Sequence, residues 1–170
     1  MIKLPRKILT INWLQNKLIN HENGIIVDDA DFSCFELIQD FLEANDHRCK
    51  TPAIYYQAFP EESAAEFIEI LREEITAKLG TAEIYLDQPL EKVVADTGLK
   101  MVIIDRCHLH PQNTLNSLLE QLANCNVRLI LVGSYDKMKV AQILNHPLIS
   151  LWDKFAVNPQ CECEYLTQVS

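Results

Sequence analysis

The sequence predicts a three-layer α/β/α sandwich built on a mainly parallel sheet of five strands. Short apolar runs rich in β-branched residues alternate with longer stretches of helical period, which is typical of β-α-β units. Three of the runs, at 25–27, 101–104 and 129–132, are almost unbroken in apolar character. Such runs are expected of parallel strands that helices cover on both faces. The length of 170 residues fits one domain over residues 1–170.

Five strands are expected in all, at 24–28, 52–59, 100–105, 127–133 and 154–157. Between them, apolar residues recur three and four positions apart, as on one face of a helix. The expected helices lie at 35–44, 63–79, 89–96, 113–124 and 137–145. Asn113 is a good cap for the fourth helix, and Pro147 is expected to close the fifth because proline cannot continue a helix.

Capping residues bound two of the other helices. Ser63 and Glu66 have the spacing of a capping box, and Gly80 is a natural stop for the helix that follows them. The next helix starts with Pro89 near its first turn and ends before Gly98, the asymmetry expected of a short helix.

The charge of the chain argues against nucleic acid and membranes as partners. The formal net charge is −9, so the overall field repels phosphates, and the small basic cluster near the N-terminus comprises only Lys3, Arg6 and Lys7. No apolar run approaches the roughly 20 residues of a membrane span, and the start of the chain lacks the pattern of a signal peptide. We therefore expect a cytoplasmic protein that does not bind DNA directly.

Four segments carry a resemblance to a known family. They read GIIVDDADFSCFELIQDF, AIYYQAFPEESAAEFIEIL, MVIIDRCHLH, and RLILVGS followed by ILNHPLI. The first occupies the place of a Walker A strand, loop and helix, the third ends in Asp105 as a Walker B strand does, and the fourth ends in Ser134 at the position called sensor 1. In order and spacing the chain resembles the TniB/TnsC branch of AAA+ ATPases, regulators of certain DNA transposons. The resemblance covers roughly residues 20–155 and implies a RecA-like P-loop core.

The phosphate-binding loop departs from the family at every defining position. An ungapped match places Asp28 and Ser33 at the two glycines, Cys34 at the lysine and Phe35 at the Ser/Thr. Glycines let backbone N–H groups approach the phosphates, the lysine neutralises them, and the hydroxyl ligates magnesium. Asp28 with Asp29 and Asp31 instead brings up to three negative charges, whose repulsion of a triphosphate costs on the order of several kcal/mol.

The Walker B-like strand keeps only half of its pattern. Asp105 could still approach a cation, and His108 matches a family histidine. The catalytic-base position holds Arg106, which stays charged and cannot accept a proton from water. The arginine finger is absent or reduced to Lys154.

These departures lead us to expect a catalytically inactive AAA+ ATPase-like protein, a pseudo-ATPase with no catalytic residues, no cofactor and no bound metal. It would act as a regulatory or accessory protein through protein–protein contacts. An ATPase, a transposition component and a second copy of the chain are the candidate partners. Two alternatives stay open: a divergent nucleotide-binding or metal-dependent hydrolase that uses Asp105 and the acidic loop, and a DNA-associated accessory protein that uses the basic N-terminus.

Plainer roles stand beside these functional ones. Asp105 could cap a turn or pair with Arg106, and the acidic loop could be a solvated turn that caps the next helix near Ser33. Tyr55 and Tyr56 are expected to be strand residues packed under a helix.

The six cysteines have irregular spacings and no Cys-x-x-Cys pair, which favours free or buried thiols. Two chemical alternatives are weighed against that interpretation. One is a Cys–His catalytic pair formed by Cys34 or Cys107 with His108. The other is a zinc site drawn from Cys107, His108, His110, Cys161 and Cys163.

Overall fold

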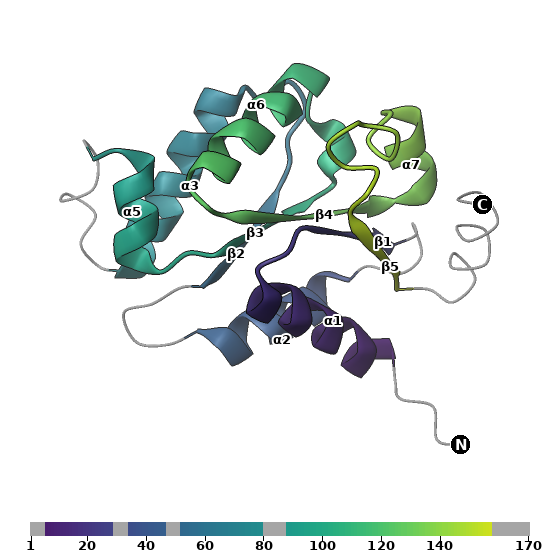
Figure 1. The fold of residues 1–170 in the computed structure, drawn as a ribbon, viewed down its shortest axis with the longest axis horizontal. Helices are drawn as coiled ribbons and strands as arrows, with labels where there is room; N and C mark the ends of the chain where they lie inside the picture. Colours follow the sequence, from purple (N-terminus) through teal and green to yellow (C-terminus); the bar gives the residue numbers. More distant parts are fainter. Residues whose placement is uncertain (1–5, 29–33, 47–51, 80–87, 158–170) are drawn as a thin grey trace.

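The protein is an α/β structure with a five-stranded, all-parallel sheet, as seen in a computed structural model (Figure 1). The structure describes residues 6–28, 34–46, 52–79 and 88–157. The strand order is β2-β3-β4-β1-β5. The strands are β1 (Gly24–Asp28), β2 (Ala53–Gln57), β3 (Met101–Asp105), β4 (Arg128–Ser134) and β5 (Asp153–Ala156). The predicted parallel α/β sheet and its five strands are confirmed, with shifts of one or two residues at their ends.

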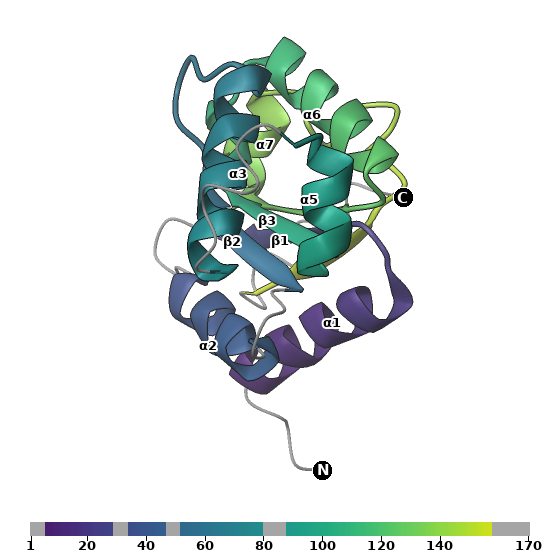
Figure 2. The same cartoon turned by 90° about the vertical axis from the view of Figure 1, so that its left-hand side faces the viewer.

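Helices cover both faces of the sheet, as Figures 1 and 2 show. One face carries α1 (Arg6–Asn20) and α2 (Phe35–Asn45). The other carries α3 (Ala64–Leu79), α5 (Leu90–Thr97), α6 (Gln112–Asn124) and α7 (Tyr135–Val140). Side chains along the central strands alternate between two buried cores, so that Ile25 packs on the α3 side and Ile26 on the α1 side.

The predicted capping residues are found at two helices. Ser63 and Glu66 exchange hydrogen bonds of 3.1 and 3.2 Å between side chain and backbone N–H, so the capping box forms at the start of α3. Gly98 follows α5 with a φ of 73°, a left-handed conformation that glycine adopts without strain. The predicted stop at Gly80 lies outside the described residues.

Two helix predictions need correction. The helix predicted at 137–145 is α7, which spans Tyr135–Val140: the Ser134 side chain accepts a hydrogen bond from the Lys137 N–H, and Gln142 has a φ of 60° that breaks the helix. Pro147 therefore lies in turns beyond the helix. Asn113 is not the cap of α6, which begins one residue earlier after Pro111.

The helix α1 was not predicted, because polar residues interrupt its buried face. Its buried residues are Thr10, Leu14 and Lys17. The Thr10 hydroxyl is satisfied within the helix by donating to the Arg6 carbonyl oxygen at 2.8 Å. A stripe in which two of three buried residues are polar does not produce the apolar periodicity that indicates a helix.

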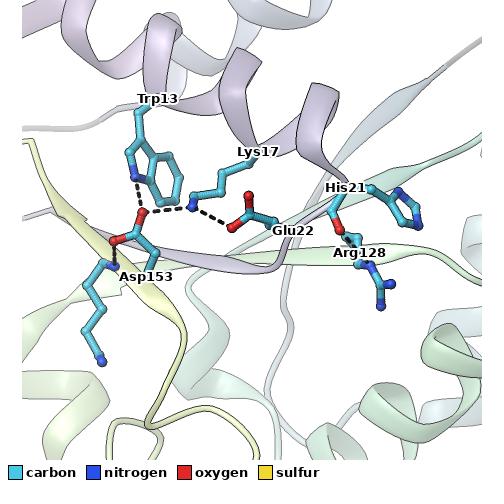
Figure 3. Close-up of polar contacts among 7 residues, drawn as sticks. Trp13, Lys17, His21, Glu22, Arg128 and Asp153 are labelled. Atoms are coloured by element: carbon cyan, nitrogen blue, oxygen red, sulfur yellow. Dashed lines mark hydrogen bonds and ion pairs between the residues drawn. The ribbon is translucent and has the colours of Figure 1, made fainter.

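Polar contacts attach α1 to the start of the sheet (Figure 3). The Lys17 ammonium lies 2.8 Å from an Asp153 carboxylate oxygen and 3.4 Å from a Glu22 oxygen, and the Trp13 indole N–H donates to Asp153 at 3.1 Å. Gly24 makes room for this arrangement, since a Cβ there would lie 2.5 Å from the Trp13 ring. These contacts hold α1 against the first residues of β1 and β5, Gly24 and Asp153.

Candidate functional site

The residues that resemble ATPase motifs converge on the carboxyl edge of the sheet. Strand register aligns Asp28 at the end of β1 with Ser134 at the end of β4, and Asp105 at the end of β3 with Gln57 at the end of β2. Ligands of open parallel α/β sheets bind at this edge. Asp29, Asp31 and Ser33 lie outside the described residues.

Cys34, which the resemblance places at the Walker A lysine, is a buried neutral thiol. It immediately precedes α2, is 1% exposed, and its Sγ lies 3.7 Å from Asp28 Oδ2 as a hydrogen-bond donor. Burial raises the pKa of the Cys34 thiol, and the charges of Asp28 and Asp105 raise it further. A neutral thiol that faces carboxylates carries no positive charge with which to neutralise a phosphate.

Both carboxylate oxygens of Asp105 accept hydrogen bonds from neighbouring protein groups. The Tyr55 hydroxyl donates to Oδ2, and the backbone N–H of Arg106 donates to Oδ1 at 2.8 Å. Burial and the Asp105 carboxylate together raise the pKa of Tyr55, so its hydroxyl keeps the proton that it donates. Phe35 packs edge-on against Tyr55, with ring centroids 5.3 Å apart. Asp105 therefore caps the turn after β3, as the plainer interpretation predicted.

The turn after Asp105 places a cation and an imidazole at the same edge. Arg106 is exposed and has a φ of 52°, and the short helix η1 (Cys107–Leu109) follows it. Burial lowers the pKa of His108, and the charges of Lys137 and Arg106 lower it further. Within the described part of the chain, His108 Nδ1 is buried without a hydrogen-bond partner. Ser134, the sensor-1-like residue, caps α7 with its hydroxyl.

Among the described candidates for the zinc site weighed from the sequence, Cys107, His108 and His110 do not form a metal-binding group. Cys107 is fully buried and lies near Gly133, whereas His110 Nε2 is 2.9 Å from Glu62 in the core. Over the described ranges, no group of three or more Cys, His, Asp or Glu side chains is arranged to hold a metal ion. Cys161 and Cys163 lie outside these ranges.

Burial also argues against a Cys–His catalytic pair. It raises the pKa of the Cys107 thiol, as it does for Cys34, so neither residue is a ready thiolate nucleophile.

A buried polar network beside α3 and α6 was missed from the sequence. The Tyr56 hydroxyl donates to Glu62 Oε1, His110 Nε2 pairs with Glu62 Oε2, and the Thr114 hydroxyl donates to the Glu62 carbonyl oxygen at 2.7 Å. Glu62 and His110 are only 5% and 6% exposed. The two segments of the network, 56–62 and 110–114, lie about 50 positions apart and share no motif, so no local signal indicated their contact.

The basic N-terminal residues are engaged within the protein. Lys7 forms an ion pair with Asp40 at 2.6 Å, and the Arg6 guanidinium lies 5.6 Å from the centre of the Phe155 ring. Lys3 lies outside the described residues. Two of the three cations proposed for DNA binding thus contact side chains of α2 and β5.

Comparison of the chain with models of protein families and with curated proteins finds no match. No helix in the described part of the chain is both long and apolar enough to cross a membrane.

Fold and site together define an α/β protein with an all-parallel sheet, whose carboxyl edge combines Asp28, Asp105, Cys34 and Arg106.

The buried thiols predict a loss of stability in alkaline solution. An unfolded thiol ionises near its ordinary pKa of 9.0, whereas Cys34 and Cys107 in the folded protein keep their protons to higher pH. The unfolded chain then binds fewer protons, so the free energy of unfolding falls by up to about 1.4 kcal/mol per pH unit for each thiol above roughly pH 9. Urea unfolding at pH 7.5, 9.0 and 9.8 measures this slope. The Cys34→Ala, Cys107→Ala double variant should lose most of it, and an equal slope in both proteins would contradict the assignment.

Proposed function

We propose that this protein is a catalytically inactive relative of the TniB/TnsC-like AAA+ ATPases, acting as a regulatory or accessory protein through protein–protein contacts. The order of its strands supports this proposal. β4 lies between β1, which precedes the Walker A-like residues, and β3, which ends in the Walker B-like Asp105. This is the arrangement that the resemblance to a RecA-like core implies.

The observation that carries the proposal is the engagement of Asp105 by the protein itself. A Walker B carboxylate acts on the magnesium ion that accompanies ATP. Here Tyr55 and the Arg106 N–H already bind both of its oxygens, and Phe35 packs on Tyr55 from the position where a magnesium-binding hydroxyl would be. A metal ion would have to displace a hydrogen bond that an aromatic pair holds in place.

The groups that would neutralise or hydrolyse ATP are also replaced. The lysine position holds Cys34, whose thiol faces Asp28 rather than a phosphate. The catalytic-base position holds Arg106, whose guanidinium cannot accept a proton. ATP binding and ATP hydrolysis are therefore both impaired. This favours a non-catalytic scaffold over an enzyme, and we propose that the protein uses no cofactor.

The contacts of the basic N-terminal residues favour a protein partner over DNA. Arg6 and Lys7 contact Phe155 and Asp40, which weakens the case for a basic N-terminal DNA contact. An ATPase or another transposition component is the partner that the resemblance suggests, and a second copy of the chain is the alternative partner.

A thermal-shift measurement with 5 mM magnesium ATP tests the proposal. We expect a melting temperature within about 0.5 °C of the ligand-free value. A ligand at 100 times its Kd would stabilise the fold by about 2.7 kcal/mol, which is more than about 5 °C for a domain of this size. The Arg106→Glu variant restores an acidic side chain at the base position and should stay equally unresponsive, because Cys34 and Phe35 remain. A rise of several degrees with the native protein would refute the proposal.

A further inference from the structure

A shallow pocket of about 310 Å³ lies at the carboxyl edge, between η1 and α7. His108, Asp136, Lys137, Val140 and Ala141 line it. Val140 is 84% exposed, so its side chain offers apolar surface to a partner. The pocket thus combines an apolar wall with charged groups.

Two cations near His108, which lines this pocket, lack acidic partners. Lys137 lines the pocket, and Arg106 is two residues before His108, whose pKa both charges lower. Throughout the described part of the chain, neither side chain forms an ion pair, unlike Lys7 and Lys17, which pair with Asp40 and Asp153. Asp136 also lines the pocket. The carboxylate whose charge raises the pKa of His108 is Asp105, and both oxygens of Asp105 already accept hydrogen bonds from Tyr55 and the Arg106 N–H. Unpaired cations in a chain of net charge −9 are suited to a complementary anionic group.

We propose that this pocket docks an acidic, apolar segment of a partner protein, with a carboxylate between Arg106 and Lys137 and a neighbouring apolar side chain against Val140 and Ala141. The inference rests on the proposed function, for which it supplies the binding surface. It specifies the chemistry of the partner: Asp or Glu adjacent to Leu, Ile, Val or Phe.

Size and charge favour a carboxylate over a nucleotide. The volume is at the small end of the roughly 300–1,000 Å³ typical of small-molecule sites, enough for one or two side chains. Asp28 and Asp105 end strands at the same edge, and they repel a triphosphate with several negative charges more strongly than a single carboxylate.

Selection from a displayed library of random peptides tests the inference and does not require the partner itself. The native protein serves as bait, and the Arg106→Gln, Lys137→Gln double variant serves for counter-selection. We expect enriched peptides that place Asp or Glu next to an apolar residue. In NMR titrations they should shift the signals of Val140, Ala141 and His108, and should bind the double variant about 5-fold more weakly.

A matched control variant distinguishes a contact made at the pocket from an effect of net charge on peptide affinity. The Lys92→Gln, Lys139→Gln double variant removes the same two charges from exposed positions on α5 and α7. Its affinity for the peptides should stay close to that of the native protein. The bound carboxylate should also raise the pKa of His108, because a nearby negative charge favours the protonated ring.

Three results would overturn the inference: no enriched peptides, peptides without acidic residues, or signal shifts confined to another surface. Magnesium ATP is titrated in parallel. Saturable ATP binding with phosphate release would refute the proposed function as well, whereas a lack of ATP binding together with no acidic preference would refute this inference alone.

Discussion

Replacement of Glu62 by alanine is expected to lower the free energy of unfolding by about 3–5 kcal/mol, a large part of the stability of an ordinary domain. Glu62 is 5% exposed and accepts from the Tyr56 hydroxyl while it pairs with His110 Nε2. Its removal leaves both groups buried without their partner, and burial of an unsatisfied polar group is among the most costly of single changes. Urea unfolding monitored by circular dichroism measures the effect.

Two variants make this prediction specific. Glu69→Ala removes the same chemical group from an exposed position on α3 and should change stability by no more than about 0.5 kcal/mol. Glu62→Gln keeps hydrogen-bonding capacity and should be less destabilising than Glu62→Ala. Equal stability of Glu62→Ala and Glu69→Ala would show that the network contributes little.

Replacement of Phe41 by alanine is expected to cost about 3–5 kcal/mol on the opposite face of the sheet. Phe41 lies on α2, has no exposed surface, and belongs to the core that includes Leu14 of α1 and Ile26 of β1. Truncation leaves a cavity that the rigid sheet cannot fill. The same urea unfolding experiment reports the change.

The control for this prediction lies on the same helix. Phe35 is 46% exposed, so Phe35→Ala removes an equal side chain with much less buried surface and should cost less than half as much. A similar loss of stability in both variants would contradict the description of α2 as a helix with one buried face.

The sequence predicted the sheet well because the central strands are buried on both sides. Ile103 of β3 and Leu131 of β4 have no exposed surface, and such positions require apolar residues regardless of the function of the protein. Parallel strands need crossover helices, so recognising the strands also located the segments between them. The ends of the strands followed, and with them the positions of Asp28, Asp105 and Ser134.

The parts that could not be predicted depend on contacts between distant residues. The helix α1 packs Leu14 into the core, but its buried face also carries Lys17, whose partner Asp153 lies 136 positions away in the sequence. The Tyr55 hydroxyl on Asp105 was also missed, because a tyrosine in a strand is equally suited to a packed core. Only the fold brings such groups together.

The most direct test of the central claim, that this edge does not hold a nucleotide, is an NMR titration of the native protein with magnesium ATP. The backbone amides of Asp28, Asp105 and Ser134 report on the three strand ends where the phosphates and metal would bind. We expect these signals to remain unchanged up to millimolar ATP. Saturable shifts at all three positions would contradict the account.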